Sequence, residues 1–314
     1  MDEKTRPLEK IVVICGPTGI GKTAVAVEAA ERFGGRIIGA DSVQIYRHMD
    51  IGTAKPNADE RSRIPHYMID IVEPDQPFDA AEYAETASAI AGKLIEERVA
   101  PFVVGGTGLY IKTLIHGIFR QPASNPSVRR ELRQAAERFG TRHLFEELLE
   151  ADPQAASKIH PNDAYRIIRA LEVYRVTGKG ISELHRNHGF ADRLFMPLKI
   201  GLHTERKRLY ERIDRRVDSM IEEGLIGEVR ALLEQGYGEE LKSMQSLGYR
   251  HMTDYLRNRT PLEEAVIALK RDTRRYAKRQ MTWFRADPEV CWFEPEQIVE
   301  IIERIGRFLD FGFV

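Results

Sequence analysis

The sequence has only two cysteines, Cys15 and Cys291, among its 314 residues. Two cysteines cannot form a zinc site by themselves, and one possible pair is no disulfide framework. Cys15 stands in an apolar run, so we expect a buried thiol there. The nine histidines are scattered and form no HExxH motif, which argues against a histidine-based metal site.

Long apolar runs and an excess of one charge are also missing. No stretch approaches the ~20 residues needed to span a bilayer, and the charged start MDEKTRPLEK lacks the apolar centre of a signal peptide. We therefore expect a cytoplasmic protein with no membrane partner. The formal net charge of -1 neither supports nor excludes a nucleic-acid partner. Nothing in the sequence requires a dimer, so we expect a monomer.

Short apolar runs rich in β-branched residues recur along the chain. Most lack polar alternation, which is typical of strands buried on both faces of a parallel sheet. They lie at residues 11–15, 36–40, 67–72, 102–104 and 198–202. Helical segments alternate with them, at residues 22–33 and 80–98. This alternation predicts an α/β fold, a parallel sheet flanked by helices.

The pattern changes after Phe119. Residues 121–127, QPASNPS, form a cluster of helix and strand breakers, and residues 128–188 carry only helical signals with many arginines. We therefore predict a P-loop-type catalytic core from residues 1–120 and 196–314, with an all-helical insertion domain at 121–195. Further helices are expected at 206–223, 225–235 and 261–285, with Thr260 as N-cap of the last and Pro261 in its first turn.

A phosphate-binding motif follows the first predicted strand. GPTGIGKT at residues 16–23 matches GxxxxGK[ST] without a mismatch and opens a predicted helix. Glycines let the backbone approach phosphate oxygens, while N–H groups and the helix N-terminus favour an anion. Lys22 would supply a charge to the terminal phosphate and Thr23 a hydroxyl ligand for Mg²⁺. The predicted diphosphate or nucleotide site is Gly16, Pro17, Thr18, Gly19, Ile20, Gly21, Lys22 and Thr23.

The motif alone leaves the bound phosphate compound open. NTP-hydrolysing proteins need a second acidic residue at the end of another strand, for which Asp41 and Asp70 are candidates. Asp41 follows the second strand, where ligands sit in open α/β sheets, although it could merely cap a turn. Thr107 follows the fourth strand and would face the same cleft or cap the next helix. No NKxD motif is present, so a GTPase is not expected, whereas an ATP-dependent small-molecule kinase stays an alternative.

Six motifs occur together and in order between about Lys10 and Arg285. They are GPTGIGKT (16–23), ADSVQIYRHMDIGTAKP (40–56), PHYMIDI (65–71), VVGGTGLYI (103–111), NDAYRIIRALEV (162–173) and RRYAKRQMTWFR (274–285). In combination they closely resemble the bacterial tRNA dimethylallyltransferase family, also called tRNA isopentenyltransferase or the IPP transferase family. The resemblance implies that dimethylallyl diphosphate, held with Mg²⁺, is the group donor. The implied acceptor is N6 of adenosine 37 in tRNAs that read codons beginning with U, which becomes N6-isopentenyladenosine.

The resemblance also implies residue roles. Asp41 is then the general base, Thr107 positions the reacting groups, and Arg216 contacts the diphosphate. Contacts to the anticodon stem-loop are implied for Asp41, Ser42, Val43, Gln44, Thr107, Arg129, Tyr165, Arg166, Ile167, Ile168 and Arg169.

A basic stripe lies on the predicted helix 261–285. Arg271, Arg274, Arg275 and Lys278 recur at spacings of three and four, so we expect them to share a face. From the pattern alone this is as well explained by an ordinary solvated face. With the family resemblance, Arg274, Arg275 and Lys278 are predicted to bind tRNA phosphates.

Three other functions fit parts of the sequence. An adenylate isopentenyltransferase would modify free AMP, ADP or ATP, but a mononucleotide needs neither the arginine-rich insertion nor the basic helix. A small-molecule kinase would transfer phosphate from ATP and ignore prenyl diphosphates. A non-catalytic P-loop RNA-binding protein would bind tRNA without needing Asp41.

Overall fold

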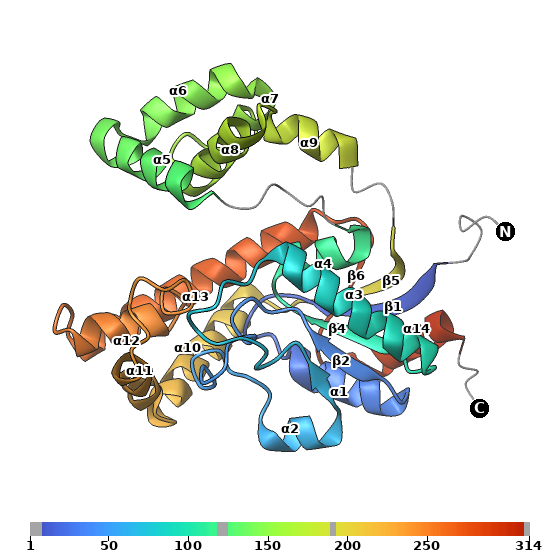
Figure 1. Cartoon of the computed structure of the whole chain (residues 1–314). Helices are drawn as coiled ribbons and strands as arrows, with labels where there is room; N and C mark the ends of the chain where they lie inside the picture. Colours follow the sequence, from blue (N-terminus) through green and yellow to red (C-terminus); the bar gives the residue numbers. More distant parts are fainter. Residues whose placement is uncertain (1–7, 118–124, 189–192, 311–314) are drawn as a thin grey trace. The chain divides into compact units, whose positions relative to one another are not determined.

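A computed structural model describes residues 8–117, 125–188 and 193–310. The chain divides into two compact units (Figure 1). The first, which we call the core unit, is Met1–Ile115 with Leu194–Val314. The second, the helical unit, is His116–Arg193. No helix within the described ranges is long and apolar enough to cross a membrane.

The core unit contains a six-stranded sheet, counted over the described residues, in which all paired strands are parallel. Its order is β3-β2-β4-β1-β5-β6. The strands are β1 (Glu9–Cys15), β2 (Arg36–Gly39), β3 (His66–Tyr67), β4 (Pro101–Gly105), β5 (Phe195–Leu202) and β6 (Val290–Phe293). This confirms the predicted α/β class with a parallel sheet.

Side chains of β1 alternate between two hydrophobic cores, one on each face of the sheet. Val12 and Ile14 join the first core, and Ile11, Val13 and Cys15 the second. The first core includes α1 (Lys22–Arg32), the start of α10 (Arg206–Glu222) and α14 (Ile298–Leu309). The second includes α3 (Ala80–Glu96), α4 (Gly108–His116), α11 (Leu225–Glu234), α12 (Tyr249–Leu256) and α13 (Leu262–Arg285) (Figure 1). Burial on both faces explains why the strands show no polar alternation.

The structure corrects several local predictions. The strand predicted at 67–72 is wrong, because β3 ends at Tyr67 and the φ angles of Met68 and Asp70 are +63° and +56°, which no strand residue adopts. Thr260 is not the N-cap of α13, which begins at Leu262 after an extended Pro261 that makes no side-chain cap. Short elements were missed altogether: α2 (Ala58–Arg63), α12, β6 and α14.

The helical unit contains α5 (Pro126–Phe139), α6 (Thr141–Ala151), α7 (Pro153–Ala156), α8 (Ala164–Thr177) and α9 (Ile181–His188). Its core is apolar and includes Leu132, Leu144 and Leu148. The Asn125 side chain accepts hydrogen bonds from the N–H groups of Ser127 and Val128, so the breaker cluster ends by capping α5. Residues 121–124 of that cluster lie outside the described residues.

Candidate active site

The P-loop joins the end of β1 to the start of α1, and its glycines are required by geometry. Gly16, Gly19 and Gly21 have φ angles of +148°, +78° and +101°, which disfavour other residues. A Cβ at Gly16 would lie 2.8 Å from the carbonyl oxygen of Leu202, and one at Gly19 would lie 2.9 Å from Ile213. The loop therefore presents its backbone and the first turn of α1 at the carboxyl edge of the sheet, as an anion site requires.

Lys22 is the first residue of α1, and its ammonium donates a hydrogen bond to the carbonyl oxygen of Pro17 at 2.9 Å. Burial lowers the pKa of Lys22 to about 8, while the nearby Asp41 carboxylate raises it and Arg216 lowers it. A bound anion would stabilise the charged form of this lysine. Lys22, Asp41 and Arg216 thus form one electrostatically coupled group.

Asp41 follows β2 in a tight turn. Its Oδ1 atom accepts hydrogen bonds from the N–H groups of Val43 (2.9 Å) and Gln44 (3.3 Å). Thr107, after β4, accepts a hydrogen bond from the Ser42 N–H at 3.1 Å. Its own N–H donates to the Ala40 carbonyl at 3.1 Å. The turns after two neighbouring strands are therefore tied together, and the turn-capping role of Asp41 fixes its carboxylate orientation.

Two cavities meet at these residues. The first has a volume of about 370 Å³ and is lined by the P-loop, Lys22, Thr23 and the last residues of β4. The second has a volume of about 560 Å³ and lies among residues 41–53, α10, residues 245–250 and α13. Both are lined by Thr18, Asp41, Thr53 and Arg216. One cavity thus offers a phosphate site and the other a separate chamber, with Asp41 and Arg216 at their junction.

The second cavity combines apolar and basic walls. Its apolar lining includes Ile213, Val217, Met220, Leu247 and Leu269. Its basic lining includes Arg250, Arg275 and Arg279. Such a chamber can accept the apolar part of a ligand, while its arginines contact phosphate groups at the edge of the chamber.

Helix α10 brings two arginines to the P-loop side of the core unit. Arg216 donates to the Ala54 carbonyl at 3.5 Å, and Arg212 donates to the Ile20 carbonyl at 3.3 Å. Burial lowers the pKa of Arg216, an effect that Asp41 opposes. The predicted catalytic residues Asp41, Thr107 and Arg216 are thus brought together around the P-loop.

Helix α13 holds the P-loop and the turn after β4 in place, through residues whose role the sequence did not reveal. The Gln280 side chain accepts from the Thr18 N–H and donates to the Gly106 carbonyl, both at 2.9 Å. A Cβ at Gly106 would lie 2.2 Å from the Gln280 amide nitrogen, so this glycine is needed for close packing. Tyr276, four residues earlier, lines the second cavity. The signal in the sequence was that two polar residues, Tyr276 and Gln280, stand four positions apart on the otherwise apolar face of α13.

The basic residues of α13 differ in their surroundings. Arg274 is paired with Asp214 of α10 at 2.7 Å and lies over the Tyr210 ring. Arg275 and Lys278 are exposed, and the contact between Arg275 and Asp272 is long, at 3.4 Å. The exposed basic surface of the helix therefore depends more on Arg275 and Lys278 than on Arg274.

The predicted tRNA-binding residues of the helical unit also divide into two groups. Tyr165 and Arg166 are exposed on α8, whereas Ile167 and Ile168 are buried in the core of the unit. Arg129 and Arg169 each pair at 2.7 Å with Glu172, which is fully buried. The Arg129 contact joins α5 to α8, whereas the Arg169 contact lies within α8. The helical pattern revealed neither role.

The side chains present suit a metal ion held largely by phosphate. Within the described ranges, no cluster of three or more His, Cys, Asp or Glu side chains could hold a metal. Mg²⁺ commonly binds through one or two protein oxygens together with substrate phosphates. Thr23 lines the P-loop cavity, and its hydroxyl oxygen could serve as one such ligand.

The chain is similar to proteins of one known family. A family model described as IPP transferase matches residues 44–287. The chain belongs to the IPP transferase family. A curated member named tRNA dimethylallyltransferase, from Desulfatibacillum aliphaticivorans, is 52% identical over 302 residues, which cover 96% of this chain and 99% of that protein. Another of the same name, from Desulfosudis oleivorans, is 50% identical over 309 residues, or 98% of each chain.

Solved structures of the family agree in fold. The full-length tRNA isopentenylpyrophosphate transferase from Bacillus halodurans has a TM-score of 0.72 and 41% identity, covering 96% of this chain and 97% of its own. A eukaryotic dimethylallyltransferase, described as acting on tRNA, has a TM-score of 0.74 and 30% identity, covering 88% of this chain and 69% of its own.

Proposed function

We propose that the protein transfers the dimethylallyl group of dimethylallyl diphosphate to N6 of adenosine 37 in tRNAs that read codons beginning with U. The product is N6-isopentenyladenosine. The observation that supports this most is the junction of two cavities at Asp41 and Arg216, with the P-loop beside the first. The names of its close relatives, tRNA dimethylallyltransferase, favour the same reaction.

The donor would occupy the P-loop cavity. Lys22, Arg216 and the loop N–H groups would hold its diphosphate, and Thr23 would contribute an oxygen ligand to Mg²⁺. When bound, Mg²⁺ would offset charge on the phosphate oxygens. The dimethylallyl group would then point toward the junction, where the second cavity begins.

The acceptor amine is a weak nucleophile because its lone pair is delocalised into the adenine ring. In the proposed step this lone pair forms a bond to C1 of the dimethylallyl group. The bond between C1 and oxygen breaks, and the diphosphate leaves with the electron pair. The N6 proton passes to the Asp41 carboxylate, which acts as general base. Asp41 is fixed for this by the two N–H groups that hold its Oδ1 atom.

Charge stabilisation would be concentrated on the leaving group. Negative charge grows on the diphosphate as it departs, and preorganised cations stabilise such charge strongly in a water-poor site. Lys22 and Arg216 are two cations already coupled to Asp41 before any ligand binds.

The tRNA would deliver adenosine 37 through the second cavity as a flipped base. Flipping a base costs a few kcal/mol, and less where it is not paired in a duplex. Thr107 and Ser42, which are joined by a hydrogen bond next to Asp41, would orient the adenine. Arg275 and Lys278 of α13, and Tyr165 and Arg166 of the helical unit, would contact the surrounding RNA.

Acceptor competition tests the proposal. Labelled dimethylallyl diphosphate and Mg²⁺ are offered to the protein with an anticodon stem-loop and AMP at equal concentration. We expect label only on the RNA. Label only on AMP would identify an adenylate isopentenyltransferase, and label on neither would reject prenyl transfer.

Donor binding is expected to weaken as the pH rises above about 8, the pKa of Lys22 in the free protein. Diphosphate stabilises the ammonium form, so above that pH binding must take up a proton, and the Kd should rise by up to ~10-fold per pH unit. Calorimetric titration with dimethylallyl diphosphate, without tRNA, measures this. Lys22→Arg is the control, since a guanidinium stays charged. A flat pH profile for the unmodified protein would contradict the assignment.

Removing charge from α13 is expected to weaken tRNA binding without affecting donor binding. In the variant Arg275→Gln with Lys278→Gln, the negative slope of the logarithm of the tRNA association constant against log salt concentration should decrease in magnitude by ~2, about one for each lost phosphate contact. The matched control is Lys93→Gln with Arg307→Gln, two exposed cations at the C-terminal parts of α3 and α14. Equal slopes for both double variants would exclude this face from RNA binding.

A further inference from the structure

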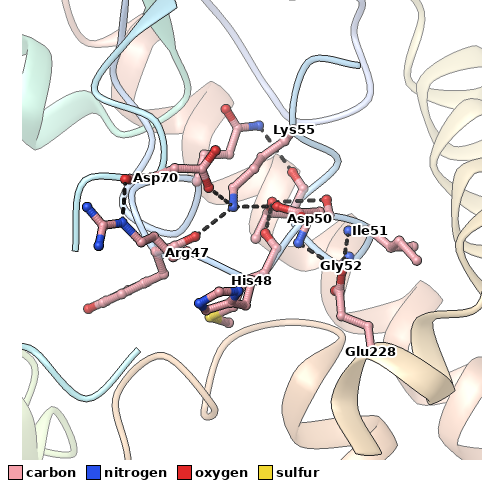
Figure 2. Close-up of polar contacts among 12 residues, drawn as sticks. Arg47, His48, Asp50, Ile51, Gly52, Lys55, Asp70 and Glu228 are labelled. Carbon is pink, nitrogen blue, oxygen red and sulfur yellow. Dashed lines mark hydrogen bonds and ion pairs between the residues drawn. The ribbon is translucent and has the colours of Figure 1, made fainter. Parts of the chain in front are cut away.

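Glu228 of α11 is a carboxylate with an unusual set of backbone donors (Figure 2). It accepts hydrogen bonds from three consecutive N–H groups, those of Asp50 (2.9 Å), Ile51 (2.8 Å) and Gly52 (3.1 Å). The hydroxyl of buried Tyr249 donates a fourth, at 2.6 Å. Hydrogen bonds to a charged acceptor are roughly twice as strong as neutral ones. The segment 50–52 is therefore fastened to α11 at every residue.

Close packing at Gly52 shows how tightly this segment meets the helices. A Cβ at Gly52 would lie 2.5 Å from the Tyr249 ring and 2.9 Å from Leu225. Tyr249 and Leu225 are both fully buried. Because a side chain could not fit there, the backbone reaches Glu228 only with glycine at this position.

Lys55 holds the other end of the same segment (Figure 2). Its side chain is 3% exposed and pairs with Asp50 at 2.7 Å and Asp70 at 2.6 Å. Its ammonium also donates to the Tyr46 carbonyl at 2.6 Å. Glu228 and Lys55 therefore fix residues 50–55, which we call the anchored loop, from two sides.

The anchored loop leads directly to the reacting groups. The Gln44 side chain donates to the carbonyls of Thr53 (3.1 Å) and Ala54 (3.2 Å). Arg216 donates to the same Ala54 carbonyl. The N–H of Gln44 is in turn one of the two that hold the Asp41 carboxylate. Movement of residues 53 and 54 would thus disturb the residues on both sides of the cavity junction.

We propose that Glu228 is a positioning residue for the transfer reaction, which holds the anchored loop so that Asp41 and Arg216 face one another across the junction of the two cavities. The proposal rests on the function proposed above. Glu228 lines neither cavity and acts only through the loop. Small displacements of reacting groups are costly, with ~1 Å reducing rates by as much as ~10²-fold.

Glu228→Gln tests the proposal, because its amide group would direct N–H donors toward N–H donors of the loop. We expect the single-turnover rate at saturating donor and tRNA to fall between ~10- and ~100-fold. The Kd for tRNA should not change. Amide hydrogen exchange should accelerate at Asp50, Ile51 and Gly52. Glu234→Gln, at an exposed position of the same helix, is the matched control and should behave as the unmodified protein.

Tyr249→Phe separates positioning from support of the core. It removes the hydroxyl donor to Glu228 but leaves the three loop contacts, so we expect a near-normal rate and normal exchange at 50–52. A normal rate in Glu228→Gln would overturn the proposal. Equal rate losses in both variants, without faster exchange at 50–52, would also overturn it. Absence of transfer by the unmodified protein would instead reject the proposed function, and with it the positioning role, while exchange would still show whether Glu228 holds the loop.

Discussion

Asp41→Asn is expected to lower single-turnover transfer to tRNA by at least ~10²-fold, the usual lower range for loss of a general base. The substitution isolates the chemistry because an asparagine oxygen can still accept the hydrogen bonds from Val43 and Gln44. The turn should survive, whereas the amide cannot take the N6 proton. Affinity for tRNA should therefore stay unchanged.

The measurement is a rapid-quench time course with saturating donor, together with filter binding of tRNA. Asp75→Asn, an exposed aspartate far along the loop after β3, is the matched control. Near-normal turnover in Asp41→Asn would remove Asp41 from proton transfer. A parallel loss of tRNA affinity would assign it to binding alone.

Arg216→Gln is expected to reduce the transfer rate by ~10²- to ~10³-fold, as for loss of one preorganised group facing developing charge. Glutamine is uncharged and shorter than arginine, so the loss should reflect the charge together with the contact of Arg216 to the Ala54 carbonyl. A second effect follows from the electrostatic interaction between Arg216 and Lys22. Arg216 lowers the pKa of Lys22, so its removal should move the pH limit of donor binding upward.

Rates and donor affinities from about pH 7 to about pH 10 measure both effects, because this range spans the Lys22 titration. Arg215→Gln, the exposed neighbour on α10, is the control and should change neither. A lowered rate with an unshifted pH limit would mean that Arg216 does not act on the same phosphate site as Lys22.

The residues best anticipated from the sequence are those in contiguous motifs at strand ends. The P-loop, Asp41 and Thr107 each follow a short apolar run, and parallel strands bring their carboxyl ends to one edge of the sheet. Their proximity therefore follows from the fold class. The four residues of β6 are too few for a clear period. Helix α14 does show apolar residues at helical spacing, at Ile298, Ile301 and Ile305, and the prediction overlooked it. Two left-handed residues after Tyr67 ended a run that looked like a strand.

Contacts between residues far apart in the chain could not be predicted from the sequence. Gln280 meets Thr18 across 262 positions, and Glu228 meets Asp50 across 178. Neither residue type stands out from its helix, because glutamine and glutamate are ordinary surface residues. Periodicity likewise could not distinguish exposed Arg166 from Arg169, whose guanidinium pairs with a buried glutamate.

The most direct test of the account is single-turnover transfer from labelled dimethylallyl diphosphate, with Mg²⁺, to an unmodified tRNA that reads a codon beginning with U. The product is digested and the labelled nucleoside located by mass spectrometry. We predict label on N6 of adenosine 37, and none when that adenosine is replaced by guanosine. Label at another position, or phosphate transfer from ATP in place of prenyl transfer, would contradict the account.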